Sequence, residues 1–190
     1  MRTLNDNKKL DILRAAGKVF PRKGFHKTLM DDVAREAKIG KGTIYRYFSH
    51  KEDLFFSILE NAMDEMHGRM IAARKKRNSP ENKVAGMLEA LADFVTENRA
   101  LLNLMHEIEG KEIMKRVKKI KAHNHKVIKV LADELENGAR AGKFKQGDYA
   151  LWAGMMAMAS RGAFHSHPEI SKSKTIKNIT DLFFYGIAKS

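Results

Sequence analysis

The segment Thr28–Phe55, TLMDDVAREAKIGKGTIYRYFSHKEDLF, decides the fold of the N-terminal part of the chain. Thr28 followed three residues later by Asp31 has the layout of a capping box, so we expect Thr28 to be the N-cap of a helix. Met30 and Val33 recur at helical spacing after it, which predicts a helix that runs to about residue 37 and turns its apolar side inward.

A three-residue break over residues 38–40 separates this helix from a second, short helix predicted over residues 41–48. Ile44 and Phe48 are four residues apart in the second helix, so both side chains lie on one face, which we expect to pack back onto the two preceding helices of the chain. Two helices joined by such a short turn form a helix-turn-helix. The second helix of such a pair fits the major groove of duplex DNA, so the segment predicts a DNA-binding motif.

Helical periodicity continues on both sides of this segment. A helix is expected before it over residues 7–23, and further helices are expected over residues 49–76, 84–95, 100–106, 111–137, 148–166 and 172–188. The chain is therefore predicted to be all-α with about nine helices. We expect an N-terminal three-helix domain over residues 1–50 and a C-terminal helical domain over residues 51–190.

The charge and composition favour a polyanionic partner. The formal net charge is +13, from 36 Lys and Arg against 23 Asp and Glu, which suits nucleic acid or an anionic membrane surface. The N-terminus has no apolar stretch typical of a signal peptide. The longest apolar stretch, residues 150–160, is shorter than the roughly 20 residues that span a bilayer. We expect a soluble, cytoplasmic protein without a membrane partner.

No pattern in the sequence indicates catalysis or a metal site. There is no nucleophile motif, P-loop or glycine fingerprint, so no catalytic residue and no cofactor is expected. The absence of cysteine excludes disulfides and thiolate ligands. His123 and His125 are two residues apart and project from different helix faces, with no carboxylate at a ligand spacing, so no metal site is expected.

The outer side of the second motif helix carries side chains suited to DNA. Lys41 can donate to a guanine edge or to a phosphate, and Tyr45 offers a ring for a thymine methyl. Gly42 allows the backbone to approach DNA closely. The alternative is that Tyr45, Tyr47 and Phe48 are core aromatic residues of a small bundle; the neighbouring lysine, the glycine and the excess charge favour the DNA reading.

The motif resembles the DNA-binding domain of the TetR family of bacterial regulators. The resemblance covers about residues 8–60 and rests on Gly24-Phe25, Thr28, Val33-Ala-Arg-Glu-Ala, Lys41-Gly-Thr-Ile-Tyr-Arg-Tyr-Phe and Ser49-His-Lys-Glu-Asp-Leu. It implies that the residue at position 28, Thr28, caps the helix that follows it and touches phosphate, and that Lys41, Gly42 and Tyr45 face the bases. It also implies phosphate-facing roles for Thr43, Tyr47, His50 and Lys51.

Two residues of the turn depart from the family pattern. Lys38 stands where the family usually has glycine, so we expect a positive φ that a side chain disfavours. Gly40 stands where the family has serine or threonine, so the second motif helix is expected to lack a side-chain cap, at a cost of a few tenths of a kcal/mol.

The resemblance also implies a ligand-binding and dimerisation role for residues 51–190. A homodimer would use the last two helices, where Trp152, Ala153, Met156 and Ser160 form one apolar side; the alternative is that this side packs within one chain. Methionine side chains adapt to apolar ligands. We therefore expect a small lipophilic effector near the residues Met66, Met70, Met87, Met105 and Trp152, with ordinary core packing as the alternative.

The features together predict a sequence-specific DNA-binding transcriptional regulator. It would be a repressor that binds a double-stranded operator as a homodimer and is released by a small lipophilic effector. One alternative is a basic protein that binds any DNA sequence. A second is a helical protein that sequesters small molecules and whose basic face is incidental.

Overall fold

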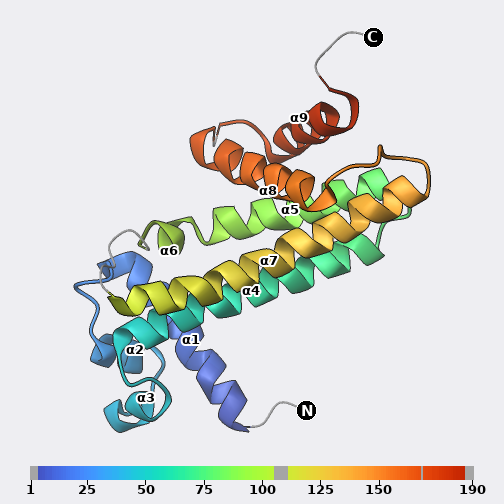
Figure 1. Ribbon diagram of the computed structural model, residues 1–190. Helices are drawn as coiled ribbons and strands as arrows, with labels where there is room; N and C mark the ends of the chain where they lie inside the picture. The colour runs from blue at the N-terminus through green and yellow to red at the C-terminus, as the bar shows by residue number, and fades with distance from the viewer. Residues whose placement is uncertain (1–3, 105–110, 168, 187–190) are drawn as a thin grey trace. The chain divides into compact units, whose positions relative to one another are not determined.

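The computed structural model describes residues 4–104, 111–167 and 169–186, and this part of the chain is helical without any strand (Figure 1). Its helices are α1 (Leu4–Lys23), α2 (Met30–Glu36), α3 (Lys41–Tyr47), α4 (Lys51–Lys75), α5 (Pro80–Glu97), α6 (Arg99–Asn103), α7 (Lys111–Arg140), α8 (Tyr149–Ser166) and α9 (Lys172–Tyr185). The predicted all-α class with about nine helices is confirmed. Within these described ranges, no helix is long and apolar enough to cross a membrane.

The chain divides into two compact units. One comprises Met1–Ala62 and Asn98–Ile120, and the other comprises Met63–Glu97 and Lys121–Ser190. Helices α4 and α7 each contribute residues to both units. The boundary predicted after residue 50, between a DNA-binding part and a ligand-binding and dimerisation part, stays a prediction.

Three phenylalanine rings form the centre of the first unit. Phe20 of α1 lies 5.9 Å from Phe25, which follows that helix, and 5.3 Å from Phe55 of α4, between ring centroids. The Phe25 and Phe55 centroids are 5.4 Å apart, and all three side chains are buried. Each such pair contributes about 0.5–1.5 kcal/mol beyond the burial of apolar area. The cluster therefore holds the end of α1 against the start of α4.

Helices α2 and α3 pack against each other as the sequence predicts. Met30, Val33 and Ala34 of α2 are buried, and α2 contacts both α1 and α3. Ile44 in α3 and Phe48 directly after it are also buried. The apolar side of α3 therefore faces the unit, which leaves the opposite side of this short helix to solvent.

The turn between α2 and α3 has the two features expected of its sequence. Lys38 has a φ of 54°, in the left-handed region that a side chain disfavours. The Ile39 amide donates to the Ala34 carbonyl at 2.9 Å and closes the end of α2. Gly40 is the N-cap of α3 and makes no side-chain cap hydrogen bond. Both expectations for this turn are confirmed.

The start of α2 corrects the predicted capping. Leu29, not Thr28, is the N-cap, and its amide donates to Asp32 Oδ2 at 3.1 Å. The Thr28 hydroxyl instead donates to the Gly24 carbonyl at 2.7 Å, and the Thr28 side chain is fully buried. The capping box predicted from Thr28 and Asp31 is wrong by one residue, because the preceding turn already engages the threonine hydroxyl.

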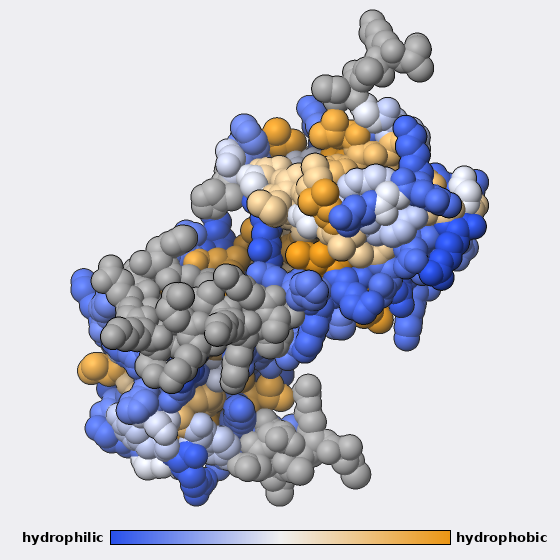
Figure 2. Space-filling view, viewed as in Figure 1, coloured by the Kyte–Doolittle hydropathy of each residue, from blue (hydrophilic) through white to orange (hydrophobic). Residues whose placement is uncertain are grey.

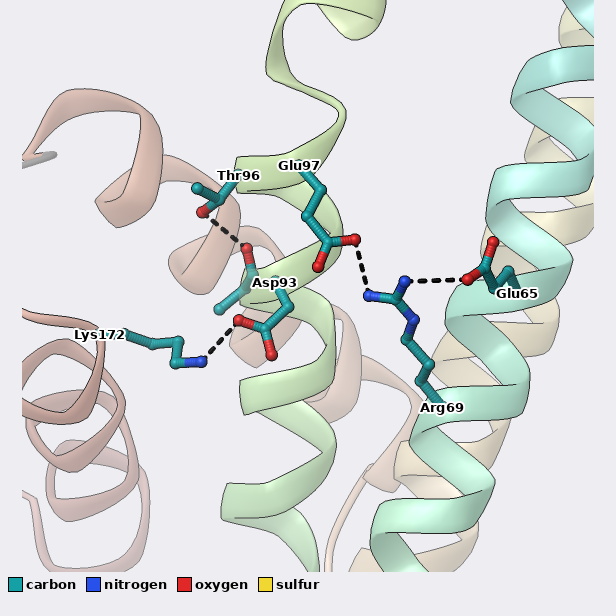
Figure 3. A network of polar contacts seen from close by, with 7 residues as sticks. Glu65, Arg69, Asp93, Thr96, Glu97 and Lys172 are labelled. Carbon is teal, nitrogen blue, oxygen red and sulfur yellow. Dashed lines mark hydrogen bonds and ion pairs between the residues drawn. The ribbon is translucent and has the colours of Figure 1, made fainter. Parts of the chain in front are cut away.

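Helix α5 packs against α8 and α9 in the second unit. Its buried side includes Val84, Met87, Leu88, Leu91 and Phe94. Figure 3 shows two polar contacts that bind neighbouring helices to α5. Arg69 of α4 donates to Glu65 at 2.9 Å and to Glu97 of α5 at 2.7 Å. Lys172 of α9 donates to Asp93 of α5 at 2.6 Å.

Helix α8 packs within its own chain through the side that the sequence predicts to form the dimer interface. Ala153, Met156 and Ser160 are buried within the chain, so packing within one chain, the alternative, is correct for these residues. The exposed apolar side chains of α8 are instead Leu151, Met155 and Met158. Figure 2 shows apolar side chains at the surface of α8 and α9. Because α8 is apolar on both sides, its periodicity does not indicate which side is buried.

Candidate nucleic-acid interface

The exposed side of α3 carries the three residues predicted to face the bases. Lys41 and Gly42 are exposed, and Tyr45, one turn further along, is 45% exposed. A Cβ placed on Gly42 would meet no atom of the chain within 4 Å, so nothing inside the protein requires glycine there. Lys41, Gly42 and Tyr45 therefore share one accessible face of a helix whose other face is anchored by Ile44.

Lys41 has an acidic partner that the sequence did not indicate. Its Nζ donates to Asp31 Oδ2 of α2 at 2.9 Å. The hydrogen bond to Asp31 raises the pKa of Lys41 above its ordinary value, and the negative charge of the same carboxylate adds to the effect. The contact links α2 to α3, ten residues apart in sequence, where no local spacing pattern applies.

The residues predicted to face phosphates occupy different environments. His50 is exposed, while Thr43 and Tyr47 are half-buried, and the Arg46 guanidinium lies 5.7 Å from the centroid of the Tyr47 ring. Thr28 is buried and its hydroxyl is bound within the chain, so its structural contact is to Gly24. DNA contacts by all four residues predicted here remain predictions.

Lys51, the first residue of α4, binds the loop after α1. Its Nζ donates to the carbonyl oxygens of Phe25 at 3.1 Å and His26 at 3.0 Å, and lies 4.8 Å from the centroid of the Phe25 ring. An ammonium group has three N–H donors, so one remains for a phosphate. Lys51, which is half-buried, therefore makes structural hydrogen bonds within the chain, and its contact with DNA stays a prediction.

Asp32 connects α1 to the start of α2. Lys23 Nζ of α1 lies 2.7 Å from Asp32 Oδ1. The hydrogen bond from Lys23 lowers the pKa of Asp32, and the hydrogen bond from the Leu29 amide lowers it further. Asp32 is therefore ionised in the first turn of α2, where a negative charge suits the helix dipole.

The predicted effector residues do not all lie together. Met66 and Met70 of α4 and Met87 of α5 are fully buried, and Met105 lies outside the described residues. Trp152 of α8 is half-buried and lines a hollow of about 790 Å³. The other side chains of this hollow include Phe144, Met155, Met156, Leu182 and Phe184. The three described methionines named above are not part of its wall.

Comparisons with known proteins agree with this geometry. Residues 12–58 match the family model described as bacterial regulatory proteins, tetR family. The chain is 29% identical over 182 residues to the HTH-type transcriptional regulator YhgD of Bacillus subtilis (strain 168), covering 94% of each protein. The fold resembles FadR from Bacillus subtilis in complex with stearoyl-CoA, with a TM-score of 0.75 and 21% identity over 94% of this chain and 99% of that chain. It also resembles the fatty acid degradation regulator FadR from Bacillus halodurans, with a TM-score of 0.78 and 20% identity over 98% of each chain.

Residues 12–58 therefore form a helix-turn-helix domain of the TetR type, and over almost its whole length the chain resembles an HTH-type transcriptional regulator. Its fold is the TetR fold, with an N-terminal helix-turn-helix and a C-terminal helical part. Members of this family are regulators of transcription and not enzymes, in agreement with the sequence prediction.

Proposed function

We propose that this regulator is a repressor that binds its operator as a homodimer and leaves the operator when a small lipophilic effector binds. The observation that carries the DNA-binding part is the exposed face of α3, where Lys41, Gly42 and Tyr45 stand together. Such a face fits the major groove, in which lysine and tyrosine can contact base edges. Thr43, Tyr47, His50 and Lys51 are the proposed phosphate-contacting residues, whereas Thr28 is fully buried and supports the motif from within through its hydrogen bond to Gly24.

The homodimer is supported by the exposed apolar side of α8. Leu151, Met155 and Met158 are exposed there, and Leu182 and Tyr185 are exposed on α9. Exposed large apolar side chains at successive turns of a helix, as at Leu151, Met155 and Met158, are typical of an interface. A symmetric dimer reads two half-sites whose centres lie about 34 Å apart on one face of DNA. Displacing α3 of either protomer from its half-site would therefore weaken binding of the dimer to an operator.

The effector is proposed to bind among the C-terminal helices, over residues 51–190. Met66, Met70 and Met87 are buried there, and their flexible side chains can rearrange around an apolar ligand. The sequence also predicts Met105 and Trp152 in this set, but Trp152 lines a hollow whose wall does not include the three buried methionines. The solved FadR structure from Bacillus subtilis contains stearoyl-CoA, which makes a long acyl chain the first effector class to test.

The dimer leaves the operator if the effector binds more tightly to a form of the dimer whose two α3 helices no longer match two half-sites. Helix α4 begins at Lys51, a proposed DNA-contacting residue, and continues through Met66 and Met70. A ligand that displaces these methionines acts on the same helix that begins at the DNA-contacting end of the motif. This continuity is the physical basis that we propose for the response.

Fluorescence anisotropy with DNA from upstream of the protein's own gene tests the proposal. We expect selective binding that is lost on Tyr45→Ala and reversed by palmitoyl-CoA. Equal affinity for any duplex would instead support a basic protein without sequence preference. No binding at low salt would support a sequestering protein, and both results would contradict the proposed function.

A further inference from the structure

A hollow in the second unit lies against the α7–α8 loop, residues 141–148. Its volume is about 790 Å³, within the range of roughly 300–1,000 Å³ that is typical of small-molecule sites. Its apolar wall includes Phe144 of the loop, Trp152 and Met156 of α8, and Leu182 and Phe184 of α9. The three buried methionines of the proposed effector set do not line it, so the hollow is a different place from that set.

The ring of Phe144, which forms one side of the hollow, is fixed by two neighbours. It stacks on Phe184 of α9, with 4.8 Å between the ring centroids and 17° between the ring planes. It also lies against Gly138 of α7, where a Cβ would collide with the Phe144 ring. The Gly138 carbonyl accepts hydrogen bonds from the amides of Lys143 at 2.8 Å and Phe144 at 3.3 Å. The α7–α8 loop is therefore held against α7 and α9.

Trp152 forms the side of the hollow that the start of α8 contributes. Its ring lies against Gly147, where a Cβ would collide with it, and meets the Tyr149 ring edge-on at 5.9 Å between centroids. Asp148 caps α8 by accepting a hydrogen bond from the Leu151 amide at 2.9 Å, which fixes the first turn of the helix that carries Trp152. The chain itself therefore holds both aromatic side chains, and a ligand does not have to order them when it binds.

The charged side chains that line the hollow are both cationic. Lys143 and Lys145 stand on either side of Phe144 in the sequence, line the hollow and are exposed. No aspartate or glutamate is part of the wall. Among the residues that the structure describes, no carboxylate forms an ion pair with either lysine. Two ammonium groups at the exposed margin of an apolar hollow suit a ligand that has an anionic end and an apolar body.

The hollow borders the surface that we propose for the dimer. Met155, Leu182 and Tyr185 are exposed, line the hollow and lie on the helices of that surface. A two-fold contact joins the same patch of both subunits. If a second copy filled the hollow in this way, the lysines of both copies would meet without a carboxylate from the wall, and such like-charge contacts are unfavourable. The charges therefore favour a small anion over a second copy as the occupant.

We propose that this hollow binds an amphipathic anion with a single alkyl chain. The alkyl chain lies against Phe144 and Trp152, and the methionines of the wall adapt to it. The head group, a carboxylate or a phosphate, lies at Lys143 and Lys145, because lysine attracts either anion as a point charge. This site goes beyond the proposed function, since the buried methionines named there do not line it.

Quenching of Trp152 emission in the free protein, without DNA, tests the site. Trp152 is the single tryptophan of the chain, and a bromine atom quenches tryptophan emission only at close range. The probes are 12-bromododecanoate and 12-bromo-1-dodecanol, which differ in the charge of the head group. We expect both to quench saturably, with the carboxylate binding about three- to tenfold more tightly at low salt. Dodecanoate and dodecyl phosphate, which carry no bromine, should displace the probe, and their relative affinities show which head group the site prefers.

A pair of double variants separates the two lysines of the wall from the total charge. Lys143→Gln/Lys145→Gln should remove the preference for the carboxylate over the alcohol and leave binding of the alcohol nearly unchanged. Lys75→Gln/Lys76→Gln is the control, because it removes two exposed lysines of the same unit that do not line the hollow. It should keep the preference. High salt should reduce the preference in the wild-type protein, since water and ions screen exposed charges.

A second pair of variants separates the hollow from the surface proposed for the dimer. Met155→Glu places a negative charge in the wall and should weaken binding of the carboxylate more than binding of the alcohol. Leu151→Glu is the control, because Leu151 lies one turn earlier on α8, is also exposed and does not line the hollow. It should keep the affinity for the carboxylate. Both variants put a glutamate on the exposed apolar side of α8, so an effect through the dimer would be the same in each.

Calorimetry with the same probes reveals the results that would overturn the assignment. Binding of the carboxylate without quenching of Trp152 would place the alkyl chain elsewhere in the protein, as among the buried methionines. Equal affinity for the two probes, or an equal loss in the two lysine double variants, would remove Lys143 and Lys145 from the site. No binding of either probe would also contradict the proposal, and Trp152 emission that changes on dilution of the protein would then show that a second copy fills the hollow. Failure to bind upstream DNA would contradict the proposed function and leave the quenching result standing.

Discussion

Lys41 Nζ of α3 lies 2.9 Å from Asp31 Oδ2 of α2, so the main cation of the proposed base-reading face is paired inside the free protein. Both side chains are largely exposed, at 65% for Lys41 and 46% for Asp31. An ion pair in that setting contributes little to folding, because water and salt screen it. The ion pair matters for DNA binding. When Lys41 contacts DNA, either the ion pair with Asp31 breaks or the Asp31 carboxylate comes close to the negatively charged phosphates.

Asp31→Asn should therefore increase DNA affinity without changing stability. Removing the carboxylate frees Lys41 and takes one negative charge away from the phosphate backbone, which predicts about three- to tenfold tighter binding at low salt. Fluorescence anisotropy across a salt series measures the effect. Asp133→Asn is the matched control, because Asp133 is also paired with a lysine and its side chain is 44% exposed. Equal gains in both variants would show that only the total charge matters.

Gly42→Ala should separate DNA binding from folding. Nothing in the chain lies within 4 Å of a Cβ at Gly42, and alanine in an exposed helix is more favourable than glycine by about 0.5–1 kcal/mol. Urea denaturation should therefore show equal or greater stability, while DNA affinity falls because the added methyl group stands between α3 and the bases. Gly68→Ala in α4, also without a neighbour within 4 Å, is the control for a gain in stability alone. Unchanged DNA affinity in Gly42→Ala would remove Gly42 from the interface.

Lys51→Ala should weaken both the fold and DNA binding. The loss of the hydrogen bonds to Phe25 and His26 predicts a loss of about 1–2 kcal/mol in unfolding free energy. Loss of one phosphate contact predicts weaker binding to all sequences and a salt slope reduced by about one unit. Urea denaturation and binding over a salt series measure the two effects separately. A stability loss with an unchanged slope would mean that Lys51 only binds the loop, and a loss of selectivity at one base pair would place it at a base.

Local patterns predicted the helices and the turn because those features depend on neighbouring residues. The apolar spacing of Met30 and Val33, and of Ile44 and Phe48, reflects a helix period and correctly identified the buried sides of α2 and α3. The positive φ of Lys38 was expected on different grounds, because the TetR family, which the motif resembles, usually has glycine at this position. Thr28 shows the limit of this reasoning, since its hydroxyl had two local partners in reach and bonded to the earlier turn.

Contacts between side chains that are far apart in the sequence depend on the packing of separate helices. Lys41 and Asp31 are ten residues apart, and Arg161 and Asn124 are thirty-seven residues apart. No repeat or motif links such positions in a single sequence. The sequence also could not indicate which side of α8 is buried, because a helix that is apolar all round has only a weak amphipathic pattern.

Lys38→Gly should stabilise the protein. Lys38 has a φ of 54°, and a side chain in this region costs about 1 kcal/mol that glycine avoids. Urea denaturation should show a gain of about that size. Lys38→Ala is the control, because it removes the same charge but keeps the Cβ, so it should give no gain. A similar gain from both variants would assign the effect to charge repulsion rather than to backbone strain.

Met158→Glu should dissociate the proposed dimer and leave the protomer folded. Met158 is 74% exposed in the single chain, so a glutamate there meets water in the monomer and would be buried without a partner in an interface through α8. Light scattering should show a monomer with an unchanged helical circular dichroism spectrum. DNA affinity should fall about 100-fold or more, because two linked half-site contacts become one. Met158→Leu keeps the apolar surface and should remain a dimer. A dimeric Met158→Glu variant would instead place the interface on another surface of the chain.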